Sequence, residues 1–214
     1  MINELKLGMK LLKYSFNLKI NIISTVLYFT LGILWCFLAN LPQFGPIYLS
    51  FIGLQIQQML SSLYFSDMVL SSPRKREIQI SVAVTVSVLS CLVFYVLTVG
   101  VILLSHKIGI QEGIPFGSLI LCGLLFMVLM VYGVLLSKTG TAMVIVFLIM
   151  FFGPILWFTS SGDQVLRDIS LGAAVGIGLA EILLGAALQY LTARLTYRMP
   201  VKYKAMLQAI QKYK

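Results

Sequence analysis

Charged side chains are scarce in this chain. Of its 214 residues only 7 are acidic and 16 are basic, so charged residues make up 11% of the sequence, against about 25% in ordinary soluble domains. Hydrophobic residues make up 59%, and the mean hydropathy is +0.97. A soluble globule of this size could not bury that much apolar surface, and a disordered chain would be poor in apolar residues. The composition therefore indicates an integral membrane protein.

Groups that serve catalysis, metal binding or cross-linking are equally scarce. The sequence has one histidine, His106, and three cysteines, Cys36, Cys91 and Cys122, each within an apolar run. It contains no His-Glu-x-x-His or Gly-x-Ser-x-Gly string, and the Ser-Lys-Thr at 137–139 lacks the glycines of a Walker A motif. We therefore expect no disulfide framework, no metal site, no cofactor and no enzyme activity in this chain.

Long apolar runs recur along the whole sequence. A transmembrane helix needs about 20 mostly apolar residues to cross about 30 Å of hydrocarbon, whereas the strands of a membrane barrel would show short alternating segments. The runs are continuous, so we predict an all-helical transmembrane domain over residues 20–193. Its six predicted spans are residues 20–39, 47–66, 78–105, 115–136, 141–158 and 169–193.

The basic residues predict how these spans are oriented. An even number of spans places both termini on one side of the membrane, and only Lys107 and Arg167 fall on the other side. The remaining 14 basic residues fall with the termini: Lys6, Lys10, Lys13, Lys19, Arg74, Lys75, Arg76, Lys138, Arg194, Arg198, Lys202, Lys204, Lys212 and Lys214. Because cytoplasmic loops carry the excess of Lys and Arg, both termini should be cytoplasmic. The net charge of +9 then reports topology and gives no support to nucleic-acid binding.

The two terminal segments have an amphipathic pattern. In residues 1–19 an apolar face opposes a lysine face, which predicts a helix lying in the membrane interface. The apolar face comprises Ile2, Leu5, Met9, Leu12 and Phe16, and the other face Lys6, Lys10, Lys13 and Asn17. This helix is either a simple anchor or an elbow helix that docks a cytoplasmic partner. Residues 194–214 form a basic cytoplasmic tail with a second helical pattern.

A basic loop separates the second and third predicted spans. Pro73 interrupts the preceding helix, and Ser71 and Ser72 are candidate N-caps for the next one. Arg74, Lys75 and Arg76 follow directly. This cluster either sets topology and binds anionic lipid or docks a protein.

Four of the polar side chains within the apolar runs are candidate functional residues. Glu181 lies in the middle of the last span, where a charged carboxylate costs about 2.5–3.5 kcal/mol, so it should face the bundle interior, a partner subunit or a water-filled cavity. Gln55, Gln58 and Ser62 follow at i, i+3 and i+7 and should share one face of the second span. All four either form hydrogen bonds between helices or line a translocation path or a dimer interface.

Two glycine-containing motifs predict local features of the bundle. Gly172-x-x-x-Gly176 is a close-packing motif, which suits contact within one subunit or between two copies. Gly153-Pro154 interrupts the fifth span. Since irregular backbone at membrane depth is tolerated where protein or water surrounds it, a re-entrant element should follow.

The organisation of the chain resembles the six-helix permease subunit of bacterial type 2 ABC transporters. The most specific stretch, Ser71-Ser-Pro-Arg-Lys-Arg-Glu-Ile78, is similar to the segment that follows the second span in that family. The resemblance implies that this stretch is a coupling helix resting on a separate ATP-binding subunit. Its coupling residues would be Ser72, Pro73, Arg74, Lys75, Arg76 and Glu77.

The resemblance also implies an assembly and a function. Two permease copies, expected as a homodimer, would join two ATP-binding-cassette subunits that hold ATP and magnesium, with the substrate route at the permease interface. The expected function is ATP-driven export of peptides or other amphipathic compounds across the bacterial cytoplasmic membrane. Two alternatives stay open from the residues: an ion- or proton-coupled carrier that uses Glu181, and a non-transporting membrane interaction or immunity protein.

Overall fold

The fold is all-helical in the part of the chain that a computed structural model describes. Described are residues 2–13, 18–38, 44–65, 67–108, 116–139 and 169–198, together with residues 148, 152–153 and 155–156. In chain order the helices are α1 (Ile2–Leu12), α2 (Leu18–Leu38), α3 (Phe44–Phe65), α4 (Asp67–Leu70), α5 (Lys75–Glu77), α6 (Ala83–Ile108), α7 (Gly117–Thr139) and α10 (Leu171–Thr196). A π-helix, η1 (Ile78–Val82), joins α5 to α6 without a break.

Four of the described helices are long and apolar enough to cross a membrane. They are α2, the continuous helix Lys75–Ile108, α7 and α10. Helix α3 has 22 residues, but three glutamines near its centre lower its hydropathy. These four helices confirm the predicted all-helical fold and the presence of several candidate membrane spans. The predicted span over 141–158 and most of the tail lie outside the described residues, so the total of six spans stays a prediction.

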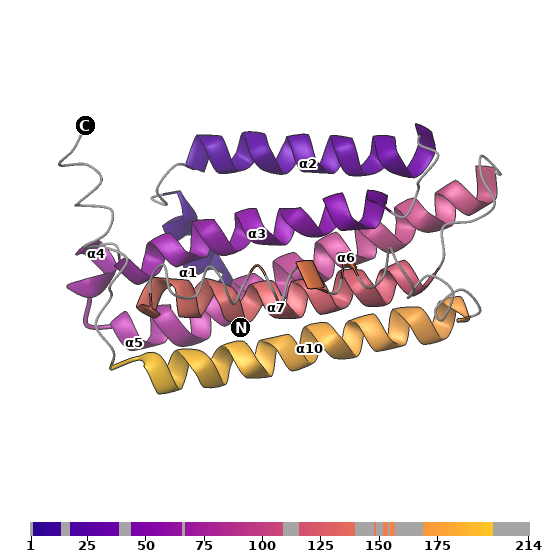
Figure 1. Cartoon of the computed structure of the whole chain (residues 1–214). Coiled ribbons are helices and arrows are strands. Elements are labelled where there is room, and N and C mark those ends of the chain that lie inside the picture. The colour runs from indigo at the N-terminus through magenta and orange to yellow at the C-terminus, as the bar shows by residue number, and fades with distance from the viewer. Residues whose placement is uncertain are drawn as a thin grey trace.

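From α2 to α7 the long helices run in alternating directions along the bundle, and α10 runs parallel to α7 (Figure 1). Helices α3, α7 and α10 end, and α2 and the Lys75–Ile108 helix begin, at the end of the bundle that carries α4 and α5. Lys19, Arg74 and Arg194 lie at this end, which we call the basic end, and Lys107 lies at the opposite end. The alternation follows from short connections between antiparallel neighbours.

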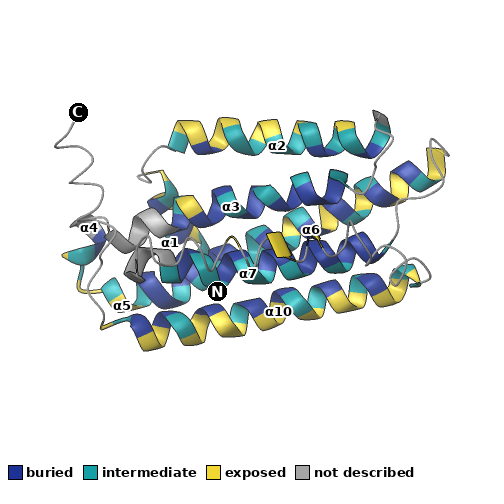
Figure 2. Ribbon diagram, viewed as in Figure 1, coloured by how far each residue is buried: buried dark blue, intermediate teal, exposed yellow. Residues whose placement is uncertain are grey.

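Helix α7 is the centre of the bundle. It packs between α3 and α10, and α2 packs on the far side of α3. Leu125, Phe126, Leu129 and Met130 of α7 have no exposed surface. Helices α2 and α10 have many exposed residues (Figure 2), and most of the large ones are apolar. An outer surface of exposed leucine and isoleucine suits contact with lipid rather than water.

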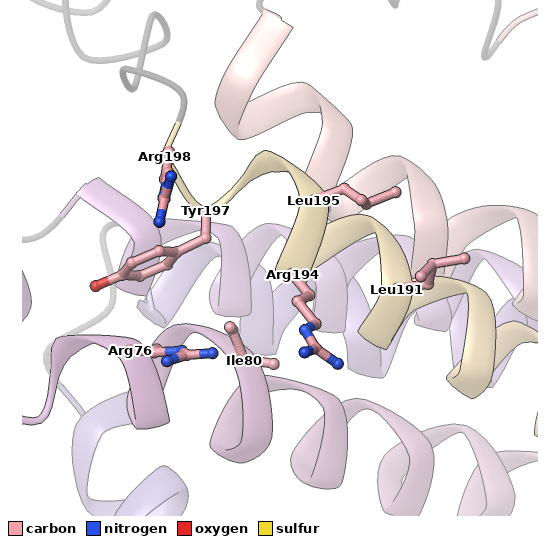
Figure 3. Close-up of a pocket in the computed structure, with 7 residues that line it drawn as sticks. All are labelled: Arg76, Ile80, Leu191, Arg194, Leu195, Tyr197 and Arg198. Carbon is pink, nitrogen blue, oxygen red and sulfur yellow. The ribbon is translucent and has the colours of Figure 1, made fainter.

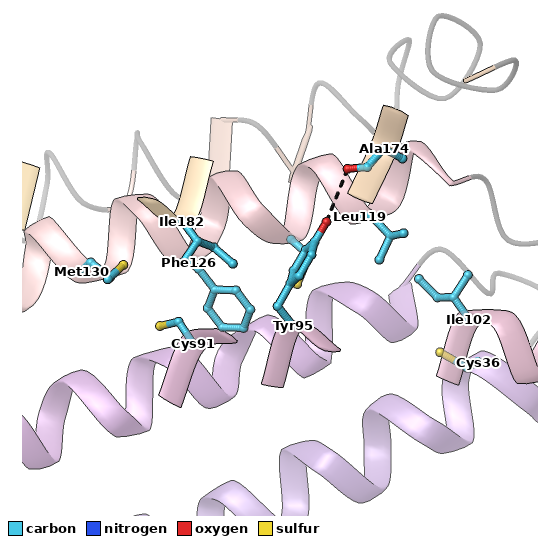
Figure 4. Packing of buried hydrophobic residues seen from close by; sticks show 10 residues of the cluster. Cys36, Cys91, Tyr95, Ile102, Leu119, Phe126, Met130, Ala174 and Ile182 are labelled. Carbon is cyan, nitrogen blue, oxygen red and sulfur yellow. Dashed lines mark hydrogen bonds between the residues drawn. The ribbon is translucent and has the colours of Figure 1, made fainter. Parts of the chain in front are cut away.

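Glycines let α7 and α10 approach each other closely. A Cβ added at Gly123 of α7 would lie 2.7 Å from the Cα atom of Gly178 in α10. Next to this crossing, the hydroxyl of Tyr95 in α6 donates a hydrogen bond to the carbonyl of Ala174 at 3.4 Å (Figure 4). Without a hydrophobic drive between helices in lipid, such close backbone contact is a main source of stability.

The first helix packs onto the bundle at the basic end. Gly8 of α1 contacts Val82 and Val86, and Leu11 is buried. Met9, which the sequence places on the apolar face, is 58% exposed, whereas Leu5 and Leu12 of the same face pack partly buried against the bundle. The predicted N-terminal helix is therefore present, and its position in the membrane interface stays a prediction.

We predict that Gly123→Ala destabilises the protein by about 1–3 kcal/mol, as other substitutions that overpack a core do. The added methyl group meets backbone atoms of Gly178, which cannot move aside without shifting α10. Thermal unfolding of the purified protein in detergent measures the effect.

The matched control is Gly100→Ala in α6, where an added Cβ meets no atom within 4 Å. Alanine is the better helix former by about 1 kcal/mol, so this variant should unfold at the same or a higher temperature. Equal unfolding temperatures for the two variants would show that α7 and α10 are not in close contact.

Candidate functional site

The loop before α5 is held by its own backbone. The amide of Ser72 donates to the Val69 carbonyl, and the amide of Lys75 donates to the Ser72 carbonyl, each at 3.1 Å. The Ser72 hydroxyl accepts from the amide of Arg74 at 3.2 Å. The N-cap residue of α5 is Arg74, and its side chain makes no capping hydrogen bond. The prediction that a serine before Pro73 occupies the N-cap position is therefore wrong. Pro73 interrupts the helix as predicted, since α4 ends at Leu70 and α5 begins at Lys75.

The four charged residues of this loop make different contacts. Arg74 and Glu77 form an exposed ion pair, with the Arg74 Nε atom 2.8 Å from Glu77 Oε2. The hydrogen bond from Arg74 to Glu77 raises the pKa of the Arg74 guanidinium. The Lys75 ammonium lies 5.9 Å from the centre of the Tyr197 ring, a distance suited to a cation–π contact. Arg76 instead faces the end of α10.

A pocket lies where Arg76 meets α10. It has a volume of about 550 Å³. Its walls come from α5, η1, the last turns of α10 and the two residues that follow α10 (Figure 3). Its lining residues are Arg76, Ile80, Leu191, Arg194, Leu195, Tyr197 and Arg198. Figure 3 shows the side chains of Arg76 and Arg194 pointing into the same space on either side of Ile80. We call this the arginine pocket.

The polar residues predicted to line a translocation path lie on two helices, α3 and α10, that are separated by α7. Gln55 is buried on α3 and Gln58 is exposed, so the predicted shared face is not uniform; the side chain of Ser62 lies outside the described residues. Glu181 lies on α10, and α7 stands between α10 and α3. Within one copy of the chain, Glu181 and Gln55 therefore do not line a common channel.

Gln57 is the polar residue of α3 that the sequence pattern missed. Its amide donates a hydrogen bond of 2.5 Å to the hydroxyl of Ser87 in α6. It lies off the predicted i, i+3, i+7 face, yet it is only 3% exposed, because α3 packs against α6 and α7 as well as α2. The spacing of polar residues along one helix face identifies the buried ones reliably only when a helix packs against protein on one side.

Glu181 is packed against α7. A Cβ at Gly123 would lie 2.6 Å from the Glu181 Oε2 atom, so the carboxyl group occupies the space that the missing side chain leaves. Its Oε2 atom is buried and has no hydrogen-bond partner among the described residues. The Oε2 atom of Glu181 therefore faces the interior of the bundle, which is one of the three surroundings expected from the sequence.

The two predicted glycine motifs have different outcomes. At Gly172 and Gly176 an added Cβ would meet no atom within 4 Å, so these residues lie on the open face of α10 and make no close contact with a described helix. Gly178, Gly123 and Gly185 make the close contacts instead. Gly153 is exposed. In the segment predicted to re-enter the membrane, Ile155 is buried and Leu156 is exposed, while Pro154 and the residues from 157 on lie outside the described residues.

Comparisons of the chain with known protein families, with curated proteins and with solved structures found no match.

We predict that Glu181→Met raises the free energy of unfolding by about 1–3 kcal/mol, since it removes a buried oxygen that has no described partner. Methionine has a similar volume and an apolar end. Leu183→Met, on the exposed face of the same helix, controls for the change to methionine and should have little effect. Chemical or thermal unfolding in detergent compares the two. A loss of stability for Glu181→Met would indicate that the carboxyl group makes a stabilising bond.

Proposed function

We propose that this chain is the permease subunit of an ATP-driven exporter in a bacterial cytoplasmic membrane. Its exposed loop, residues 71–77, would rest on a separate ATP-binding-cassette subunit. The cargo class that we favour is peptides or other amphipathic compounds. The proposal is supported most by the way this loop is joined to the bundle.

The loop continues directly into a long apolar helix. From Lys75 to Ile108 the chain is helical without interruption, and Ile78, Ile80 and Val82 of η1 are buried against the bundle. A force applied to the exposed Arg74–Glu77 pair would therefore move the whole helix, because no flexible joint separates them. π-Helical turns inside longer helices are frequent at functional sites.

The energy for transport would come from the partner. The sequence has no ATP-binding motif, and the described residues contain no cluster of His, Cys, Asp or Glu able to hold a metal ion. The proposed assembly has two permease copies and two ATP-binding subunits. The unoccupied face of α10 at Gly172 and Gly176 supports a contact between permease copies, since small residues permit close helix approach.

We further propose that the chain has six spans with the basic end in the cytoplasm. In inside-out vesicles, Arg74→Cys should then react with a membrane-impermeant maleimide and Lys107→Cys should not. In right-side-out vesicles the pattern should reverse. The same labelling of both positions in one vesicle type would contradict this orientation.

The coupling role predicts a loss of partner binding when the exposed pair is removed. Arg74→Ala with Glu77→Ala should lower copurification of the proposed ATP-binding-cassette subunit by about tenfold or more, as loss of an interface hot spot does. Lys107→Ala at the opposite end is the control and should copurify normally.

The charge swap Arg74→Glu with Glu77→Arg separates two roles of this pair. It keeps the intramolecular attraction but reverses the charges that a partner meets, so we expect it to lose binding as well. If the charge-swapped variant binds its partner normally, the ion pair only stabilises the loop and does not contact the partner. If the unmodified chain binds no ATP-binding protein, the proposed function is wrong.

The buried oxygen of Glu181 favours a second candidate, a proton-coupled carrier. Such acids within a membrane are often part of ion or proton pathways. Uptake driven by a pH gradient into liposomes that contain only this chain, and abolished by Glu181→Gln, would identify the carrier and exclude the exporter subunit.

A further inference from the structure

We propose that the arginine pocket is a binding site for the headgroup of an anionic phospholipid, with an acyl chain lying along the outer face of α10. This inference does not rest on the proposed transport function. It follows from the charges in the pocket and from the apolar surface that leads away from it.

The pocket concentrates positive charge without a neutralising acid. Arg76, Arg194 and Arg198 all line it, and none of its lining residues is acidic. These three guanidinium groups form no ion pair with a described residue. Three such groups around one pocket repel each other, and a phosphate group placed among them would relieve the repulsion and accept bidentate hydrogen bonds.

A second pocket of about 340 Å³ adjoins the first and shares Arg76, Ile80 and Arg194 with it. It also contains Ser81, Tyr190 and the Arg74–Glu77 pair. Glu77, the one acid lining either pocket, is already paired with Arg74, so it does not neutralise Arg76 or Arg194. The neighbouring hydroxyl groups suit the polar glycerol portion of a headgroup.

An apolar stripe runs from the pocket along α10. Leu184, Leu188, Leu191 and Leu195 are spaced by 4, 3 and 4 residues and so lie on one helix face. All four are exposed, with Leu195 at 69% and Leu191 at 51%, and the last two also line the pocket. A phosphate site that continues into an exposed leucine stripe matches a phospholipid better than a soluble phosphate, which would use only the charged part.

The position of the pocket in the bundle agrees with this ligand. It lies at the end of α10 next to Tyr197, and tyrosine is enriched where a membrane meets water. Juxtamembrane arginines gain about 1 kcal/mol each near an anionic lipid surface. The site is therefore placed where headgroups would be found if α10 crosses the bilayer.

The test is a titration of the full-length protein, in a nonionic detergent, with phosphatidylglycerol and with phosphatidylcholine. Native mass spectrometry measures the bound lipid. Phosphatidylglycerol should bind more tightly, and Arg76→Gln with Arg194→Gln should weaken its binding by about tenfold or more. Lys6→Gln with Lys10→Gln removes the same charge from exposed positions of α1 and should change the affinity less than about twofold, as the loss of exposed charges outside the site should.

Two further measurements separate a built site from general attraction. Arg76→Lys with Arg194→Lys keeps the charge and the fold but loses the planar fork of donors, so it should also weaken binding. Glycerol 3-phosphate and inorganic phosphate, added at the same concentrations, should not displace the lipid. Equal losses in the glutamine variants of α1 and of the pocket, or full displacement by either soluble phosphate, would overturn the proposal.

Discussion

The bundle depends on the close approach of α7 to α10. The backbones meet at Gly123 and Gly178, where neither residue has room for a side chain. This contact leaves space for the Glu181 carboxyl group beside Gly123 and brings the Tyr95 hydroxyl onto the carbonyl of Ala174. Because lipid offers no hydrophobic drive for helix association, such shape-dependent contacts decide which helices become neighbours.

The position of α7 has a consequence for function. With α3 on one side and α10 on the other, α7 separates the polar residues of α3 from Glu181. A route through the middle of a single copy would have to cross the best-packed helix of the bundle. In the described part of one copy, the polar residues of α3 and Glu181 are therefore separated by a tightly packed helix.

The basic end combines two kinds of surface in a few residues. Arg74 and Glu77 are paired and exposed, whereas Arg76 turns toward Arg194 and the end of α10. Neighbouring residues at the start of this helix therefore make different contacts, because helix positions two residues apart lie on different sides. The π-helix η1 continues from α5 into α6 without a break.

The sequence by itself determined the helical class and the approximate limits of the described long helices. An uncharged run of about 20 residues has few stable forms in lipid other than a helix, and Pro73 marks a break whatever the surroundings. The sequence also predicted that Glu181 avoids lipid, since exposing a carboxyl group to lipid is costly, but it left open whether the residue faces the bundle interior, a partner subunit or a water-filled cavity. Only the tertiary structure decided which residues meet. It placed Gly123, rather than Gly172 or Gly176, at the close crossing and buried Gln57 instead of Gln58. It also brought Arg76 to Arg194, more than a hundred residues away in the chain. Side-chain periodicity shows which residues share a helix face, but the neighbour that covers the face depends on packing between whole helices.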